Sequence, residues 1–470
     1  MSGFYRTRCV QIILTEQGYH IGNYGLSFFI VPGSTDHDHV PPKKPVLQKS
    51  LSLKRELGLF EITLSGVGII LGAGIYVLIG QGAALSGNAL WLAFIISAII
   101  AVFTCMSYAE LSSMFPKAGA EYEYVVHAFS KRLAFIVGFL VLLSGILAAA
   151  TVSLGFAGYL FNMTRIPVLI SAVALIIVLT LVLGYGVRET AWIAIISTFI
   201  EVSGLAIIIA VGIPSWGSVD YFEMPHGISG LFAASALIFF AYQGFESMVK
   251  FSEETRSPET TVPKALILAL AISVIIYILV AISAVSVLGW KDLGASDAPF
   301  ADIAAGTAGP GAAILISVIA LFATGNTVLM SMYASSRILY GMAGSRVLPR
   351  WFSMVHATRR TPLSAILLCS FLSMVFVFSG DIAFVANVTN FTLFITFIVI
   401  NGAVIALRFR TPQVSRPFRI PFTIRKIPVI PVLGIFLCIF LLLQQEWSVL
   451  VLGAVLISAG IIFAYIKNPP

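Results

Sequence analysis

The chain has 470 residues, of which 59% belong to the apolar set and only 10% are Asp, Glu, Lys or Arg, and its mean hydropathy is +0.99. A soluble domain carries roughly 25% charged residues, so this composition excludes a water-soluble globule, and the high hydrophobicity excludes an intrinsically disordered chain. The class that remains is a polytopic membrane protein, in which the positions of the 28 basic residues matter more than the formal net charge of +7.

The first part of the chain, residues 1–50, differs from the rest. It mixes polar and apolar residues, contains several prolines and ends with a basic stretch that includes Lys43, Lys44 and Lys49. The apolar run Gln11–Leu14 is too short for the core of a signal peptide. We therefore expect a poorly ordered cytoplasmic N-terminal tail over residues 1–50.

The remainder of the chain consists of long apolar windows. A bilayer core of about 30 Å requires roughly 20 apolar residues in a helix. The backbone in lipid must satisfy its own hydrogen bonds, and runs such as Ala312–Ala323 do not alternate as the strands of a membrane barrel do, so the windows predict helices. Twelve transmembrane helices are expected, near 59–84, 89–114, 133–161, 166–186, 191–213, 228–250, 264–290, 310–342, 362–380, 382–407, 428–445 and 447–466.

The distribution of basic residues predicts the orientation. If the N-terminus is cytoplasmic, only Arg165 and Lys291 of the 28 basic residues fall in outward loops. Basic residues concentrate in cytoplasmic loops of membrane proteins. We therefore expect both termini to be cytoplasmic.

The first window contains a glycine-rich stretch, with Gly66, Gly68, Gly72 and Gly74 close together. Each glycine in a helix interior costs about 1 kcal/mol relative to alanine. One interpretation is a break in the helix. The alternative is close helix packing, because Gly68 and Gly72 form a GxxxG pair.

The sixth window strengthens the first interpretation. Gln243, Gly244 and Glu246 lie inside an otherwise apolar run, and an acid within a membrane helix is a functional candidate by default. The two irregular windows are five helices apart, as expected for two inverted five-helix repeats that each open with a broken helix. This predicts a first repeat over 51–213, a second repeat over 214–407 and two additional helices over 408–470. Free N–H groups at a break bind a carboxylate and free carbonyls bind an ammonium group, so a zwitterionic amino acid fits such a site.

Four motifs, in order over about residues 55–470, resemble the amino acid–polyamine–organocation (APC) permeases, nearest to the cationic amino acid transporter branch and its prokaryotic relatives. They are Gly68-Ile-Ile-Leu-Gly-Ala-Gly-Ile-Tyr76, Tyr108-Ala-Glu-Leu-Ser-Ser-Met-Phe-Pro-Lys-Ala-Gly-Ala-Glu-Tyr122, Phe239-Phe-Ala-Tyr-Gln-Gly-Phe-Glu246 and Tyr333-Ala-Ser-Ser-Arg337. The resemblance implies an all-α, LeuT-like fold with a five-plus-five inverted repeat, two extra C-terminal helices and alternating access to a central site.

The resemblance also implies where substrate binds. Phe240 is placed where the family carries an aromatic residue over the substrate, although simple packing of Phe240 and Tyr242 is the alternative. The implied substrate-binding backbone is that of Ile70, Leu71, Gly72, Ala73 and Gly74 in the first window and of Phe240, Ala241, Tyr242, Gln243 and Gly244 in the sixth.

The sequence departs from the family at the residue expected to couple transport to an ion. Many proton-coupled members of the family carry a lysine in the fifth helix. Alignment from Arg188 brings Glu201 to that position, and no Lys or Arg occurs between Trp192 and Val211. A glutamate is neutral when protonated, so Glu201 is expected to carry a proton or bind a cation, assisted by hydroxyls such as that of Ser331. The alternative is that Glu201 faces a polar crevice or forms a structural hydrogen bond. Glu246 is a second coupling candidate, with helix capping as its alternative.

Three other acids, Glu110, Glu121 and Glu123, lie at the inner end of the second window, near Lys117 and Arg132. We expect them to form an intracellular gate or ion pairs that stabilise the fold rather than to contact substrate.

The predicted function is secondary active transport of amino acids across the plasma membrane, as a proton-coupled symporter or with sodium as the coupling ion. An exchanger of amino acids or polyamines without net ion coupling and a transporter-like amino acid sensor are the alternatives. Because the chain shows no GxSxG, HExxH or phosphate-loop motif, we expect no enzyme activity. No metal site is expected, since the four cysteines lack metal-ligand spacing. No cofactor and no nucleic-acid partner are expected either. Membrane lipid is an expected partner.

Overall fold

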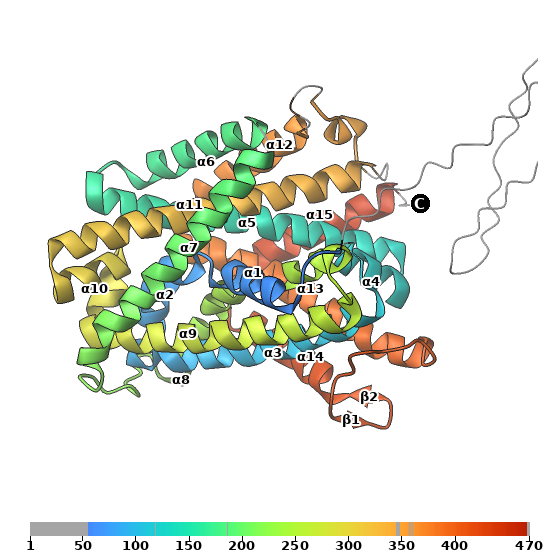
Figure 1. The fold of residues 1–470 in the computed structure, drawn as a ribbon, viewed down its shortest axis with the longest axis horizontal. Helices are drawn as coiled ribbons and strands as arrows, with labels where there is room; N and C mark the ends of the chain where they lie inside the picture. Colours follow the sequence, from blue (N-terminus) through green and yellow to red (C-terminus); the bar gives the residue numbers. More distant parts are fainter. Residues whose placement is uncertain are drawn as a thin grey trace, which may run out of the picture. The chain divides into compact units, whose positions relative to one another are not determined.

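Figure 1 shows the fold in a computed structural model. The structure describes residues 55–117, 119–185, 187–344, 348–356, 359 and 361–467, and the tail expected at 1–50 lies outside them. The described residues form one compact unit.

Most of the described chain is helical. The α-helices are α1 (Leu59–Leu71), α2 (Gly74–Ser86), α3 (Leu90–Met114), α4 (Ala120–Ala128), α5 (Lys131–Thr164), α6 (Val168–Tyr185), α7 (Val187–Gly212), α8 (Gly227–Ile238), α9 (Pro258–Ala295), α10 (Pro299–Ala308), α11 (Pro310–Gly344), α12 (Leu363–Val377), α13 (Ile382–Arg410), α14 (Val429–Leu443) and α15 (Trp447–Lys467). Short 3₁₀ helices are η1 (Gly87–Ala89), η2 (Ile213–Ser215), η3 (Phe239–Tyr242), η4 (Phe245–Glu254) and η5 (Arg350–Ser353), and the strands are β1 (Thr423–Ile424) and β2 (Ile427–Pro428).

The helices have the length and composition of membrane spans. Within the described residues, nine stretches are long and apolar enough to cross a bilayer, with Gly74–Met114 counted as one stretch. The shorter apolar helices are α1, α12 and α14. Every window expected from the sequence contains apolar helix, and the polytopic membrane architecture is confirmed.

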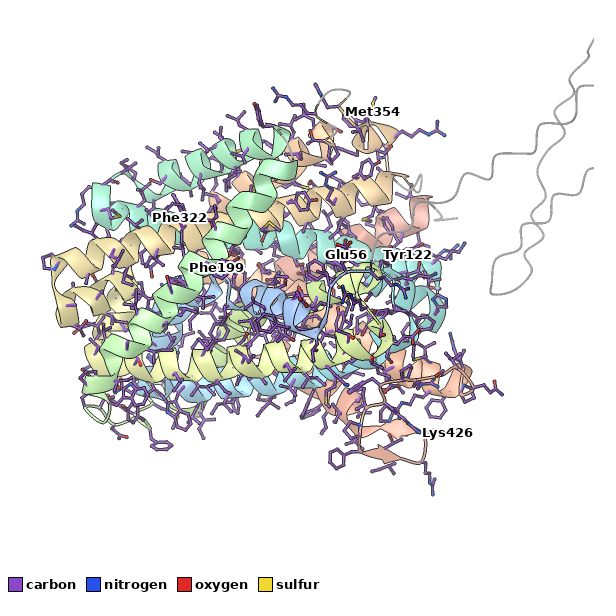
Figure 2. The ribbon with its side chains drawn as sticks, viewed as in Figure 1. Glu56, Tyr122, Phe199, Phe322, Met354 and Lys426 are labelled. Carbon is purple, nitrogen blue, oxygen red and sulfur yellow. The ribbon has the colours of Figure 1, made fainter. Side chains whose placement is uncertain are left out.

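The outside of this helical unit is apolar. Phe199 on α7 is 68% exposed and Phe322 on α11 is 48% exposed, and both lie on outward-facing helix surfaces (Figure 2). A large exposed apolar surface is expected where lipid replaces water as the solvent. The largest buried side chains are also aromatic, and they include Tyr76, Tyr242 and Tyr277.

Three small elements were not expected from the sequence. Helix α4 begins after Gly119 and carries Glu121 and Glu123 in its first turn. Acidic side chains in the first turn stabilise a helix because they lie at the positive end of its dipole. Helix α10 is a ten-residue segment between α9 and α11. Strands β1 and β2 pair antiparallel across a two-residue turn and form a hairpin between α13 and α14. Windows of about 20 apolar residues do not detect such short elements.

Candidate functional site

The first expected break lies between α1 and α2. Helix α1 ends at Leu71 and α2 begins at Gly74, so Gly72 and Ala73 connect two half-helices. The last carbonyls of α1 and the first N–H groups of α2 therefore lack partners within their helices. Two of these groups bind side chains: the Ala73 N–H donates to Thr327 Oγ1 at 3.0 Å, and the Ile70 carbonyl accepts from the Tyr277 hydroxyl at 2.5 Å.

The second break lies between η3 and η4. Helix α8 continues as η3 to Tyr242, and Gln243 and Gly244 separate η3 from η4. Gly244 has φ +120°, a conformation that residues with a Cβ rarely adopt. The Gln243 N–H donates to the Phe240 carbonyl at 3.2 Å, which closes the turn that ends η3.

The two breaks face one another. A Cβ added to Gly74 would lie 2.7 Å from the Ala241 Cα, and a Cβ added to Gly244 would lie 2.9 Å from the Ile69 carbonyl oxygen. The Tyr277 hydroxyl on α9 approaches both the Ile70 carbonyl and the Ala241 carbonyl, the second at 2.8 Å. The structure thus brings together the backbone segments around 70–74 and 240–244 on which the sequence analysis places substrate binding.

The two aromatic side chains of the second break are buried. Tyr242 donates its hydroxyl to the Phe94 carbonyl at 3.1 Å and packs edge-on against the rings of Phe94 and Tyr277. Phe240 is only 4% exposed. Packing and a hydrogen bond explain the buried position of the Tyr242 side chain. A role for Phe240 over the substrate stays a prediction.

Glu201 lies on the face of α7 that runs along the first break. A Cβ added to Gly68 in α1 would lie 2.5 Å from the Cγ2 of Thr198, one turn before Glu201, and the Tyr76 hydroxyl in α2 donates to the Glu201 carbonyl at 2.6 Å. Because α1 and α2 flank Gly72 and Ala73, these two contacts place Glu201 beside the break. Its side chain is 1% exposed, and among the described residues neither carboxyl oxygen has a hydrogen-bond partner. A buried carboxylate without partners is costly, so this group requires a proton or a ligand.

Glu246 caps the half-helix in which it lies. Its carboxylate accepts the Gly244 N–H at 2.9 Å, and its side chain is buried. The capping alternative is therefore seen directly, and a coupling role stays a prediction. Ser331 is half-buried on α11, where its carbonyl accepts the Ser335 hydroxyl at 2.8 Å.

Three polar residues at the breaks were missed from the sequence: Thr327, Tyr277 and Asn390. The Asn390 amide donates to the carbonyls of Ala236 and Leu237, near the end of α8 and just before η3. Each of the three is a polar side chain within a long apolar helix, which is the signal that would have identified them.

Two of the three acids expected to stabilise the fold form ion pairs. Glu110, in α3, pairs with Arg408, whose Nε and Nη2 donate to its carboxylate at 3.0 and 2.5 Å. The sequence did not identify this partner, because Arg408 is distant from Glu110 and gives no local signal. Glu123 does approach Lys117, at 3.8 Å, and Glu121 accepts the Tyr108 hydroxyl at 3.4 Å.

A family model described as amino acid permease matches residues 57–465. The chain belongs to this family. The permease is 29% identical over 443 residues to the branched-chain amino acid permease BcaP of Bacillus subtilis, and the match covers 89% of this chain and 94% of the relative. It is also 28% identical to the methylthioribose transporter of Bacillus subtilis, over 83% of this chain and 88% of the relative. A third relative is the vacuolar cationic amino acid transporter 4 of Arabidopsis thaliana, 27% identical over 77% of this chain and 64% of the relative. The permease is a membrane transporter and not an enzyme, as predicted.

Proposed function

We propose that this permease is a secondary active transporter that moves amino acids by alternating access and couples their uptake to protons. The observation that carries the proposal is the contact between the two breaks, where backbone polar groups from α1, α2, η3 and η4 meet at the centre of an apolar helical unit. In a hydrocarbon environment irregular backbone is tolerated where it is buried in protein or lines a site.

The polarity of the half-helices favours a zwitterion. The N-terminus of α2 presents the N–H groups of Gly74 and the residues after it, and the positive end of a helix dipole favours a carboxylate. The other N-terminus at the site, that of η4, is already occupied by the Glu246 carboxylate. The Ala73 N–H already donates to Thr327. We therefore assign the substrate carboxylate to the N–H groups of Gly72 and Gly74, and the substrate ammonium to the carbonyls that end α1 and η3.

Glu201 is proposed as the main coupling residue. Its carboxyl group is buried beside the first break and lacks hydrogen-bond partners among the described residues. Protonation removes the cost of an unpaired buried charge, so proton occupancy and the state of the break are linked. In this scheme the Thr327 and Ser331 hydroxyls on α11 supply polar contacts, Glu246 is a second site for the proton, and sodium is the alternative ion for an ionised Glu201.

The proposal also includes a membrane topology. Twelve spans would divide into repeats over 51–213 and 214–407 with two further helices over 408–470, and both termini, including the tail at 1–50, would be cytoplasmic in the plasma membrane. The concentration of basic residues on one side supports this orientation.

Transport assays separate these alternatives. A thermal-shift screen of the common amino acids on purified permease identifies ligands, and because one relative is named for methylthioribose, that compound is included. Uptake of each hit into proteoliposomes is then measured with and without an imposed pH gradient, for the wild type, Glu201→Gln and Glu246→Gln. Accumulation driven by the gradient in the wild type but not in Glu201→Gln supports proton symport.

Three results would contradict this scheme. Gradient dependence retained in both variants would remove both acids from coupling. Counterflow without any gradient dependence would favour the exchanger, and binding without transport would favour the sensor.

A further inference from the structure

The last turn of α13 and the connection from it to α14 are strongly basic. Residues 408–428 contain six basic residues and no acid: Arg408, Arg410, Arg416, Arg419, Arg425 and Lys426. The hairpin of β1 and β2 lies in this connection, and β2 ends immediately before the first residue of α14, Val429. Four residues of strand span about 13 Å, so the turn at Arg425 stays within that distance of the helix start. The hairpin therefore lies near the end of two apolar helices.

Three of these cations are used in holding the connection together. Arg408 is 5% exposed, and its Nη1 donates to Thr423 Oγ1 at 2.8 Å. Arg410 donates to the Ala128 carbonyl at the end of α4. Arg416 donates to backbone carbonyls at the end of α13 and just after it, those of Leu407, Thr411, Pro412 and Val414. These contacts fix the hairpin and its base relative to α4 and α13.

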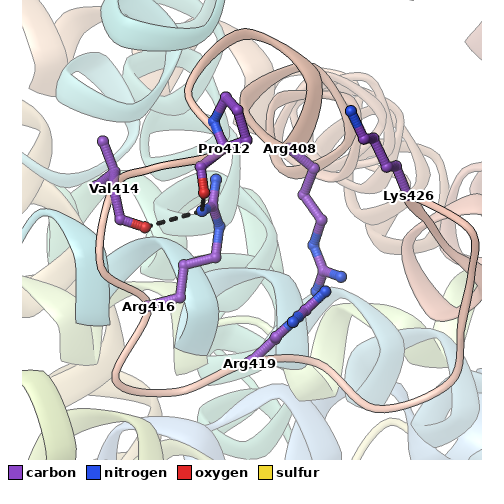
Figure 3. Close-up of a pocket in the computed structure, with 6 residues that line it drawn as sticks. All are labelled: Arg408, Pro412, Val414, Arg416, Arg419 and Lys426. Atoms are coloured by element: carbon purple, nitrogen blue, oxygen red, sulfur yellow. Dashed lines mark hydrogen bonds between the residues drawn. The ribbon is translucent and has the colours of Figure 1, made fainter.

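Arg419 and Lys426 differ from those three cations. Both are exposed, and within the described part of the chain neither side chain forms a hydrogen bond or an ion pair. They line a pocket of about 360 Å³ together with Arg408 and Arg416 (Figure 3). Desolvation lowers the pKa of Arg416, the Glu110 carboxylate opposes this shift, and the charges of Arg408 and Arg419 add to it. The pocket thus holds more positive charge than the buried Glu110 carboxylate balances.

The hairpin also exposes apolar side chains beside these cations. Phe422 is 76% exposed and Ile424 is 69% exposed. Phe422 has φ +58°, a conformation that costs a residue with a side chain about 1–3 kcal/mol. The hairpin therefore presents an aromatic and an aliphatic side chain at the surface, in the same connection as the exposed cations.

We propose that the hairpin binds an anionic phospholipid of the adjacent leaflet. The lipid phosphate contacts Arg419 and Lys426 at the pocket, while Phe422 and Ile424 enter the boundary between headgroups and acyl chains. Basic residues next to membrane helices attract anionic lipids, and exposed aromatic and aliphatic side chains anchor a segment at the interface. A soluble phosphate ion would use the cations but would gain nothing from the two apolar side chains.

Lipid titration of the purified full-length permease in detergent tests the proposal. Bound lipid is measured by native mass spectrometry and by the shift in Tm, with phosphatidylglycerol, phosphatidylcholine, glycerol phosphate and inorganic phosphate. We expect phosphatidylglycerol to bind at least tenfold more tightly than phosphatidylcholine. The variant Arg419→Gln/Lys426→Gln should lose at least tenfold in affinity for phosphatidylglycerol, and the control Lys291→Gln, at an exposed cation after Trp290, should lose none.

A second measurement places the apolar residues. Fluorescence of Phe422→Trp, compared with the wild type, should be quenched by brominated phosphatidylglycerol more than by brominated phosphatidylcholine in vesicles. Equal binding of the two lipids, or unchanged phosphatidylglycerol binding by the double variant, would overturn the proposal. Full competition by inorganic phosphate together with no quenching in Phe422→Trp would assign the pocket to a soluble anion instead.

Discussion

At the residue scale, the site depends on positions where the backbone of one segment lies directly against another segment, with no side chain between them. Gly244 combines a positive φ with close approach to the Ile69 carbonyl, so both its conformation and its lack of a Cβ are required. The glycines predicted the breaks from sequence because their low helix propensity is a local property.

Gly244→Ala should therefore damage both fold and transport. We expect a loss of stability of about 1–3 kcal/mol from strain alone, with a further loss from the contact at Ile69, and uptake reduced at least tenfold. The matched control is Gly325→Ala in α11, where an added Cβ meets nothing within 4 Å. That variant should keep its Tm and its uptake, and equal behaviour of the two variants would contradict this explanation of Gly244.

Replacement by glutamine should change the Tm differently at two buried acids. Glu110→Gln breaks a buried ion pair with Arg408 and should destabilise the permease by about 3–5 kcal/mol, seen as a lower Tm. Glu201→Gln removes a carboxyl group that has no partner among the described residues and should leave the Tm unchanged or raised. Gradient-driven uptake should be lost in Glu201→Gln. A large drop in Tm in Glu201→Gln would assign that acid a structural role.

At the element scale, the sequence predicted the helices better than it predicted their contacts. Hydropathy identified each apolar window, and glycine content and the Gln-Gly-Phe-Glu stretch located both interruptions, because these signals are local. The bonds from Tyr277 and Thr327 to the first break join residues more than 200 positions apart, so no window of one sequence shows them. The hairpin of β1 and β2 is likewise too short for periodicity to reveal.

One contact between elements suggests that α1 and η4 move together. The Glu56 and Leu57 N–H groups donate to the Glu254 carbonyl, the Arg256 N–H donates to the Leu57 carbonyl, and Leu57 pairs with Thr255 as a parallel bridge. A short thiol crosslink between Leu57→Cys and Thr255→Cys, in a background without the native cysteines, should leave uptake within about twofold of the uncrosslinked protein, as expected if these half-helices form one rigid body. Inhibition that a reductant reverses would show instead that they separate during transport.

At the scale of the whole molecule, the proposed orientation follows from charge and is open to a direct labelling test. Phe222, in the acidic loop after α7, is 63% exposed, and Met354, in the basic loop after α11, is also 63% exposed. In intact cells a membrane-impermeant thiol reagent should label Phe222→Cys and spare Met354→Cys until the cells are permeabilised. The wild type is the background control, and the reverse pattern would invert the topology.

The central claim is that the two interrupted helices hold the substrate by their backbone groups. A cryo-EM structure of the permease in nanodiscs, saturated with the amino acid that gives the largest thermal shift, tests it most directly. We expect the substrate carboxylate within hydrogen-bond distance of the N–H groups of Gly72 and Gly74, and its ammonium group within that distance of carbonyls at the ends of α1 and η3. Substrate bound elsewhere, with both breaks unchanged and empty of ligand, would contradict this claim.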